Sequence, residues 1–386
     1  MAGGSRPAPT LGILGGGQLG RMTALAAIPL GVRVRFLVPQ PSDPIADFGD
    51  VTIADWTDAA VLARFAEGCT AVTAESEWAP VDLLAAAAPG LALHPGPDCI
   101  ATIRHKGRQK QALVEAGLPV AAFRSCVTQE DAYKAAVQFE YPVVVKQFEG
   151  SYDGYGNATA QNDDDLTRAW GLLVAEPGAE RLGGALVEAF VPFERELSVL
   201  VARRPGGESV CYPVADTVQR DHRCHSVTVP AAIPDETAQE ARRIALSAVE
   251  ALGCTGLTAV ELFALEDGRI LINEVAPRPH NTGHVTIEGC ATSQFENHVR
   301  AVLDLPLGST DLLAPAAVMV NILGHRNGTV DFASIPDVLL SEGVHLHLYG
   351  KTTVRERRKM GHVTVLGADA SDCLRRAEAA AAAVKL

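Results

Sequence analysis

Two glutamates in the second half of the chain have the type and spacing of a metal-binding pair. Residues 259–284 read AVELFALEDGRILINEVAPRPHNTGH, and two apolar runs flank the dipeptide Asp267-Gly268, which is typical of two-residue hairpin turns. Such a turn predicts that Glu261 and Glu274 lie opposite each other on neighbouring strands. Directly opposed carboxylates repel each other, so the pair indicates a bound cation. Hard oxygen ligands favour magnesium, with manganese as the alternative.

The register of this hairpin decides whether the two carboxylates meet. The same two-residue turn also predicts that Leu265 lies opposite Ile270. If the register differs, Glu261 and Glu274 do not face each other and one of them is merely solvated. The metal site is therefore a hypothesis that depends on one strand pairing.

Three polar residues follow the predicted hairpin. Arg278, His280 and Asn281 are presented together, and the prolines at positions 277 and 279 keep the segment out of a helix. An arginine beside a magnesium–phosphate centre stabilises the charge on a transferring phosphoryl group. A lone arginine or histidine is usually a surface residue, but three such side chains beyond a carboxylate pair favour a reactive site.

Elements of a nucleotide site precede the hairpin. Lys146 ends the apolar run PVVVK, a suitable place for a point charge on a phosphate. The segment GSYDGYG, residues 150–156, either folds over phosphates with its backbone donors or forms a simple hairpin between strands. Glu188 lies at a predicted strand end and Glu196 follows eight residues later. Carboxylates at such positions can hold an adenine amino group or a ribose.

A basic run lies near the C-terminal end of the sequence. The segment YGKTTVRERRKMGH, residues 349–362, contains Lys351, Arg358 and Lys359. In a chain with a net charge of −13, such a cluster indicates a local anion site. The alternative is a solvated basic turn.

The composition fits a globular protein of two or three domains. The chain has 386 residues, of which 47% are hydrophobic and 20% charged. Its net charge of −13 argues against general binding to nucleic acid or to a membrane surface. The eight cysteines form no C-x-x-C pair, and no apolar run approaches the length of a membrane span. We therefore expect free thiols, a reducing compartment and a cytoplasmic location.

The elements that must position these residues divide the chain into three predicted units. Residues 1–104 alternate strand-like and helix-like segments, which indicates an α/β domain with a parallel sheet. Residues 105–305 read as an α+β domain, and residues 306–386 as a small domain that closes with an Ala-rich helix. The predicted strands are 11–14, 32–38, 51–54, 71–73, 142–147, 185–188 and 196–202, and the predicted helices are 19–28, 59–67, 81–88, 106–116 and 164–173.

The first glycine-rich segment has the spacing of a dinucleotide-binding fingerprint. The pattern G-x-G-x-x-G at residues 15–20 follows a predicted strand and opens a helix, as in sites that bind pyrophosphate. Such sites need an acidic residue at the end of the second strand. Here that strand ends in PQP at residues 39–41, and the next acid, Asp43, already lies in a loop. We therefore predict a tight turn, or a loop that contacts a different ligand, rather than an NAD or FAD site.

Together these motifs resemble the ATP-grasp superfamily, and within it the N5-carboxyaminoimidazole ribonucleotide synthetases of purine biosynthesis. The resemblance covers nearly the whole chain, and the motifs occur in the family's order: GGGQLGRM, YDGYGN, FERELSV, VELF, NEVAPRPHNTGH, TSQFENHVRAVLDLPLG, YGK and RKMGHVTV. It implies an ATP-grasp architecture, with a Rossmann-like domain at 1–104, an ATP-grasp domain at 105–305 and a small C-terminal domain at 306–386. The resemblance also suggests a homodimer.

The resemblance implies a reaction and its substrates. ATP phosphorylates bicarbonate, which is a poor electrophile, to give carboxyphosphate. This intermediate breaks down to carbon dioxide, which the N5 amine of aminoimidazole ribonucleotide captures. Shielding from water would protect the short-lived intermediate.

The resemblance also implies a role for each candidate residue. Glu261 and Glu274 would hold magnesium, and Arg278 would stabilise the transferring phosphoryl group or the carboxyphosphate. Asp153 is the best candidate to handle the amine proton. The remaining candidates are Lys106, Lys146, Glu188 and Glu196 for the nucleotide; Tyr152, His280 and Asn281 around the ribonucleotide and carboxylation centre; Lys351, Arg358 and Lys359 for the ribonucleotide 5′-phosphate; and Gln18, Leu19 and Glu75 for the other wall of that site.

Some residues depart from the family pattern, and other functions share part of it. Tyr155 stands where the family usually has a basic residue, and we assign no role to His222 or His225.

Another ATP-grasp ligase or a formyl-phosphate-type transformylase would share the metal and ATP residues and differ in the acceptor. A non-catalytic nucleotide-binding regulator would not need Arg278, Asp153 and the basic run together.

Overall fold

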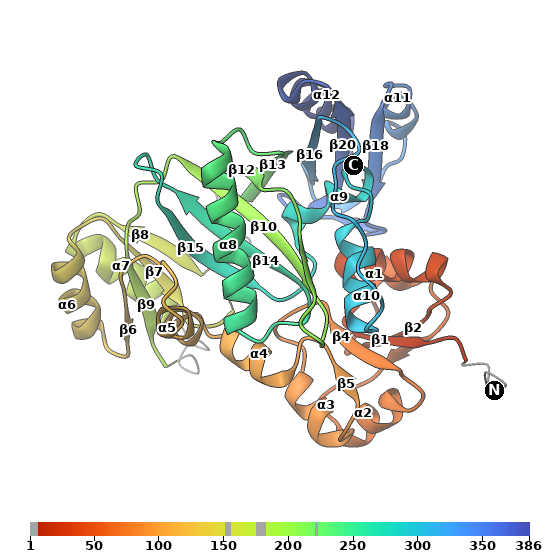
Figure 1. Ribbon diagram of the computed structural model, residues 1–386, viewed down its shortest axis with the longest axis horizontal. Helices are drawn as coiled ribbons and strands as arrows, with labels where there is room; N and C mark the ends of the chain where they lie inside the picture. Colours follow the sequence, from red (N-terminus) through yellow and green to blue (C-terminus); the bar gives the residue numbers. More distant parts are fainter. Residues whose placement is uncertain (1–6, 151–155, 175–182, 221–222) are drawn as a thin grey trace.

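The computed structural model describes residues 7–150, 156–174, 183–220 and 223–386. In these ranges the strands form a five-stranded, a four-stranded and a nine-stranded sheet, together with a two-stranded ribbon of β17 (Gly328–Thr329) and β19 (Thr353–Val354). Figure 1 shows the five-stranded sheet at the bottom, the four-stranded sheet at the left, and the nine-stranded sheet running from the centre to the upper right.

The five-stranded sheet is parallel, as predicted, with strand order β3-β2-β1-β4-β5. Its central strand β1 is buried along its whole length, because helices cover both faces of a parallel sheet. Helices α1 and α10 (Gln294–Val302) pack on one face, and α2 and α3 on the other. The elements are β1 (Thr10–Leu14), β2 (Arg33–Val38), β3 (Val51–Ile53), β4 (Ala71–Ala74), β5 (Ala92–Leu93), α1 (Gln18–Ala27), η1 (Ile28–Leu30), η2 (Asp43–Ile45), α2 (Ala59–Ala66), α3 (Val81–Ala87) and α4 (Pro97–Ile103).

The four-stranded sheet is antiparallel, with strand order β6-β9-β7-β8. Helices α6 and α7 cover one face, where they pack on Val143 and Val145. Because side chains alternate along a strand, Lys146 points to the opposite face. The elements are β6 (Phe123–Cys126), α6 (Gln129–Phe139), β7 (Val143–Gln147), β8 (Asn157–Ala160), α7 (Asp163–Leu173) and β9 (Ala185–Ala189).

The nine-stranded sheet has the order β15-β14-β10-β12-β13-β16-β20-β18, and β11 pairs with β10. Helix α8 covers its central part and α12 its C-terminal part. The elements are α5 (Lys106–Glu115), β10 (Arg195–Arg203), β11 (Ser209–Cys211), β12 (Ala215–Arg220), β13 (Arg223–Val229), α8 (Asp235–Ala251), β14 (Gly256–Ala264), β15 (Ile270–Ala276), η4 (Asn281–Gly283), α9 (Thr286–Gly289), α10 (Gln294–Val302), β16 (Ala316–Leu323), α11 (Ile335–Leu339), β18 (Val344–Leu348), β20 (Lys359–Gly367) and α12 (Ala370–Ala383).

One sheet therefore crosses from the predicted central domain into the predicted C-terminal domain. Strand β13 pairs with β16, with Val227 opposite Met319. The two units share a hydrogen-bonded sheet rather than meeting only through side chains, and the boundary between residues 305 and 306 stays a prediction.

The turn of the β14–β15 hairpin differs from the predicted one. Leu265 N–H donates to Arg269 O at 2.9 Å, and Gly268 has a φ of +83°. These are the features of a three-residue loop with a left-handed third residue. The predicted two-residue turn is therefore wrong, and Ala264 rather than Leu265 lies opposite Ile270.

A bulge in β15 restores the predicted pairing of the two glutamates. Leu262 lies opposite Ile272, but Glu261 lies opposite Glu274, so Asn273 is the extra residue on β15. A bulge of this kind re-aims side chains and is frequent next to active sites. The longer turn shifts the register by one residue and the bulge shifts it back.

Two expectations from composition concern the cysteines and the membrane. All eight cysteines are free, as expected. Among them, Cys99 of α4 and Cys254 after α8 pack with their sulfur atoms 3.2 Å apart. In the part of the chain that the structure describes, every helix is too short or too polar to cross a membrane.

Candidate active site

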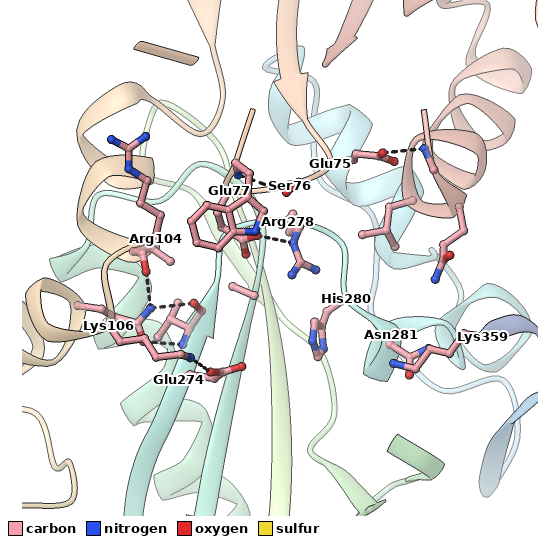
Figure 2. A pocket seen from close by; sticks show the side chains of 18 of the residues that line it. Glu75, Ser76, Glu77, Arg104, Lys106, Glu274, Arg278, His280, Asn281 and Lys359 are labelled. Atoms are coloured by element: carbon pink, nitrogen blue, oxygen red, sulfur yellow. Dashed lines mark hydrogen bonds and ion pairs between the residues drawn. The ribbon is translucent and has the colours of Figure 1, made fainter. Parts of the chain in front are cut away.

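A cavity of about 380 Å³, here called the interdomain cleft, lies between the five-stranded and nine-stranded sheets. Figure 2 shows Lys106 and Glu274 on one side, Asn281 and Lys359 on the other, and Arg278 and His280 between them. The glycine loop, the segment after β4, the start of α5, β15 and β20 all contribute to its walls. The predicted site residues that line it are Gln18, Leu19, Glu75, Lys106, Glu274, Arg278, His280, Asn281 and Lys359.

Glu261 and Glu274 lie at directly opposed positions, as predicted. Their side chains are 26% and 36% exposed, so an ion can reach both. Lys106, at the start of α5, forms an ion pair with Glu274, and His280 Nε2 lies 3.6 Å from Glu261 Oε1. Burial and the neighbouring Glu274 raise the pKa of Glu261, whereas Lys106 lowers the pKa of Glu274. Glu261 therefore binds a proton more tightly than Glu274 does.

Arg278 is held by a carboxylate from the first domain. Its Nε donates to Glu77 Oε2 at 3.0 Å, and the two side chains are only 22% and 12% exposed. The partners lie 201 residues apart in the sequence, so no local pattern pointed to Glu77. The pair fixes one edge of the guanidinium inside the cleft, where Arg278 was predicted to act.

His280 and Asn281 both line the cleft but differ in their contacts. The backbone N–H of His280 donates to Gln294 Oε1 at 2.9 Å, and its Nδ1 lies 3.0 Å from Thr282 Oγ1. Its Nε2 is left facing Glu261. The buried amide of Asn281 exchanges two hydrogen bonds, of 2.9 and 2.8 Å, with Asn321 of β16. These hydrogen bonds fix the Asn281 side chain against strand β16.

A second cavity of about 430 Å³, here called the inter-sheet pocket, lies between the four-stranded and nine-stranded sheets. Lys146 and Glu188 line it, together with Phe190, Phe193 and Phe263. The rings of Phe193 and Phe263 stack with centroids 4.5 Å apart. Flat apolar walls beside charged residues suit a base that carries phosphates.

Charged partners hold Lys146 and Glu188 together in this pocket. Glu188 Oε2 lies 2.6 Å from Lys146 Nζ, and Glu188 Oε1 lies 3.0 Å from Lys110 Nζ. Lys146 also donates to Asn273 Oδ1 at 3.1 Å. Sequence reasoning missed Lys110 and Asn273. Lys110 lies four residues after Lys106, and residues at this spacing share one face of a helix. This spacing was the signal that could have identified Lys110.

Glu196 lies close to Glu261 rather than at a cavity wall. It pairs in register with Phe263 on β14, and it is not among the described residues that line the cleft or the pocket. Its charge contributes to the raised pKa of Glu261. Its predicted contact with the nucleotide stays a prediction.

The glycine loop binds a carboxylate of the protein itself. Glu75 Oε1 accepts from Gly17 N–H at 2.6 Å, and Oε2 accepts from Gly20 N–H at 2.7 Å. Burial raises the pKa of Glu75, and these hydrogen bonds oppose the rise. A Cβ at Gly15 would lie 2.3 Å from Glu75 Cγ. Glu75 thus occupies the helix N-terminus where a dinucleotide would place its pyrophosphate.

The basic run meets the glycine loop across the cleft. Lys351 Nζ donates to Gln18 Oε1 at 2.7 Å and to the Lys359 carbonyl at 2.5 Å. Lys359 is 9% exposed and lines the cleft. Arg358 donates to the Thr353 carbonyl at 3.1 Å and is not among the described residues that line the cleft. The structure thus brings Lys359 and Lys351 to the predicted site and places Arg358 beside it.

Some predicted residues fall outside the described ranges. These are Tyr152, Asp153 and Tyr155, together with His222. His225 of β13 is described, and its Nε2 lies 2.9 Å from Glu378, so this contact joins β13 to helix α12.

Three protein-family models match consecutive parts of the chain. A ribonucleotide synthetase preATP-grasp domain matches residues 8–104, an ATP-grasp domain matches residues 111–295, and a phosphoribosylaminoimidazole carboxylase C-terminal domain matches residues 317–376. Their order is that of the three predicted units.

Similar proteins match over nearly the full length. The N5-carboxyaminoimidazole ribonucleotide synthase of Mycobacterium tuberculosis is 42% identical over 97% of this chain and 87% of its own. A crystal structure of an ADP complex of an N5-carboxyaminoimidazole ribonucleotide synthetase is 38% identical with a TM-score of 0.89, and it covers 98% of both chains. The Aspergillus clavatus N5-carboxyaminoimidazole synthase in complex with ADP and 5-aminoimidazole ribonucleotide is 32% identical with a TM-score of 0.87, again over 98% of both chains.

Proposed function

The chain belongs to the family of N5-carboxyaminoimidazole ribonucleotide synthases, and from this premise we propose how its two cavities divide the reaction between them. The protein is an ATP-dependent ligase that carboxylates 5-aminoimidazole ribonucleotide to N5-carboxyaminoimidazole ribonucleotide in purine biosynthesis. We assign ATP to the inter-sheet pocket and aminoimidazole ribonucleotide with bicarbonate to the interdomain cleft.

One observation carries this assignment. Asn273 and Glu274 are consecutive residues, yet Asn273 lines the inter-sheet pocket and Glu274 lines the interdomain cleft. The bulge in β15 therefore forms the boundary between the cavities, and the carboxylate pair lies on it. A phosphoryl group that leaves ATP at this boundary enters the cleft directly, where bicarbonate and the acceptor would be held close together.

The donor set at the boundary fits a divalent cation. Glu261 and Glu274 supply two opposed carboxylates, and within the described ranges no group of three or more His, Cys, Asp or Glu residues has metal-binding geometry. Magnesium usually takes one or two carboxylates and completes its ligands with phosphate and water. Glu261 and Glu274 would hold magnesium there, and the ion would supply charge neutralisation to the phosphate oxygens.

The residues of the cleft then act on bicarbonate and the amine. Arg278, oriented by Glu77, stabilises the charge of the transferring phosphoryl group and of carboxyphosphate. His280 lies at the carboxylation centre, and Asn281 braces that segment against β16. Asp153, which lies outside the described ranges, takes the amine proton, and Tyr152 contacts the ribonucleotide.

The other wall of the cleft holds the ribonucleotide. Lys351, Arg358 and Lys359 bind its 5′-phosphate, and Gln18 and Leu19 line the side nearest the glycine loop. Glu75 supports that wall, since the loop backbone already binds its carboxylate. We further propose that the protein is a homodimer and, because its substrates are water-soluble metabolites, that it acts in the cytoplasm.

A comparison of two acceptor pairs tests the proposed function. ADP release is measured with ATP, magnesium and either aminoimidazole ribonucleotide plus bicarbonate or glycinamide ribonucleotide plus formate. We expect turnover with the first pair only. Turnover with the formate pair alone would overturn the proposal.

The variant Glu274→Ala tests the metal assignment. We expect it to abolish turnover while the circular-dichroism spectrum stays unchanged, and near-normal activity of this variant would contradict the assignment.

A further inference from the structure

Lys110 is a buried lysine behind the nucleotide pocket that the reaction scheme does not use. Its side chain is 3% exposed, and its ammonium lies 3.0 Å from Glu188 Oε1 and donates to the Ile272 carbonyl at 3.0 Å. It is not among the described residues that line either cavity. Lys110 therefore contacts groups of the protein itself, one in each of two sheets.

Lys146 shares the same carboxylate but faces the pocket. Its ammonium lies 2.6 Å from Glu188 Oε2, so each oxygen of Glu188 has its own lysine. Burial alone would raise the pKa of Glu188, but Lys146 and Lys110 outweigh it and hold the pKa at about 2. Burial lowers the pKa of Lys110 to about 8, so below that pH the two ammonium ions and one carboxylate carry a net positive charge beside the pocket.

This arrangement matters when a phosphate arrives. An incoming phosphate competes with Glu188 for the charge of Lys146, and a close ion pair with the phosphate draws the ammonium away from its 2.6 Å contact with Glu188. If Lys146 were the sole partner of Glu188, that movement would leave a buried carboxylate unpaired, which is strongly unfavourable. With Lys110 fixed by two acceptors, Glu188 keeps an ion pair throughout.

We propose that Lys110 is a positioning residue, the fixed counter-ion of Glu188, and that it thereby releases Lys146 to bind the phosphates of ATP. Lys110 and Lys106 lie one turn apart on α5. The helix therefore supplies a cation to Glu274 in one sheet and to Glu188 in the other. The inference rests on the proposed function only in assigning ATP to the inter-sheet pocket, and it is independent of the acceptor.

A double-mutant cycle tests the proposal. The variants are Lys110→Met, Glu188→Gln and the two combined, because methionine is unbranched and flexible enough to fill the space of a buried lysine stem. Binding of the non-hydrolysable analogue AMP-PNP with magnesium is measured by calorimetry, and KM for ATP and for aminoimidazole ribonucleotide by steady-state kinetics. Lys134→Met removes an exposed lysine that pairs with Glu130 on α6 and serves as the matched control.

We expect Lys110→Met to weaken AMP-PNP binding by about tenfold and to raise KM for ATP, with KM for aminoimidazole ribonucleotide unchanged. In the Glu188→Gln background, which has no trapped carboxylate, adding Lys110→Met weakens AMP-PNP binding much less than it does in the unmodified protein. Lys110→Arg keeps the charge and most of the affinity, which provides a second measurement if Lys110→Met fails to fold. Lys134→Met behaves as the unmodified protein.

Two outcomes would overturn the proposal. Lys110→Met with unchanged AMP-PNP affinity would show that Glu188 does not restrain Lys146. A loss from Lys110→Met that is as large in the Glu188→Gln background as in the unmodified protein would show that it does not arise from an unpaired Glu188 carboxylate. AMP-PNP binding requires no turnover. The role of Lys110 can therefore be tested even if the carboxylation assay shows no activity.

Discussion

Glu261 and Glu274 lie opposite each other, and their pKa values are shifted in opposite directions. Burial and Glu274 raise the pKa of Glu261 above its ordinary value of 4.5, whereas Lys106 lowers that of Glu274 below 4.5. Without a cation, the pair therefore holds a proton on Glu261 at pH values where an exposed glutamate is ionised. A bound cation must displace that proton.

The contribution of Glu261 to the stability of the metal-free protein should fall as the pH rises. Between about pH 4.5 and about pH 8 the unfolded chain releases the Glu261 proton while the folded protein keeps it, so this contribution to the free energy of unfolding decreases with increasing pH. Glu261→Gln removes the titrating group, so the stability of the unmodified protein relative to this variant should decrease across the range, and the variant also loses turnover. The measurement is the urea unfolding midpoint in EDTA across this range.

The control for this prediction lies in the same hairpin. Glu266→Gln changes an exposed turn residue and should follow the unmodified protein at every pH. Added magnesium should stabilise the unmodified protein most at the alkaline end of the range. Parallel slopes for Glu261→Gln and the unmodified protein would refute the proposed proton on Glu261.

Glu77→Gln should slow the reaction without weakening ATP binding. The substitution removes the charge that orients Arg278 at 3.0 Å, and hydrogen bonds to charged groups contribute about 1.5–3 kcal/mol, so we expect kcat to fall about tenfold or more. KM for ATP should not change, because neither residue is among the described residues that line the inter-sheet pocket.

Glu67→Gln, at an exposed position of the same domain, is the matched control and should leave kcat unaltered. The readout is bicarbonate-dependent ADP release at saturating ATP. A raised KM for ATP with an unaltered kcat would contradict the role given to the Arg278–Glu77 pair.

Gly15→Ala should destabilise the first domain and displace Glu75. The new Cβ would lie 2.3 Å from Glu75 Cγ, at a residue with φ of +113°, so we expect a loss of about 3 kcal/mol in the free energy of unfolding. Gly171→Ala is the contrasting variant, since its Cβ meets open space in helix α7. That change should stabilise the protein by up to about 1 kcal/mol. Equal urea midpoints for the two variants would refute the steric argument.

The hairpin illustrates how far sequence reasoning reached. The pairing of Glu261 with Glu274 was predicted from a two-residue turn, and the pairing is confirmed although the turn is wrong. The real turn is one residue longer, and the bulge at Asn273 compensates for it. A bulge is set by packing on both faces of the sheet, so the local pattern of apolar and polar residues did not reveal it.

Four of the five strands of the parallel sheet were predicted, because alternating buried strands and amphipathic helices leave a local record in the sequence. The two-residue strand β5 (Ala92–Leu93) was not predicted. The contacts that orient the site were not predicted, although Glu75 was expected on the wall formed by Gln18 and Leu19. Glu77 meets Arg278, and Glu75 enters the glycine loop, through contacts between segments far apart in the chain. Such pairs depend on how domains dock, which no periodicity within one segment encodes.

The interdomain cleft also constrains when the protein can become active. Gln18 of the first helix forms only part of the cleft wall. Lys351 donates a hydrogen bond to its side chain, and Lys359 lines the same cleft. During synthesis, the first domain leaves the ribosome long before residues 351–359 are made. Under the proposed function, a nascent chain therefore lacks a complete ribonucleotide site until β20 has joined the sheet.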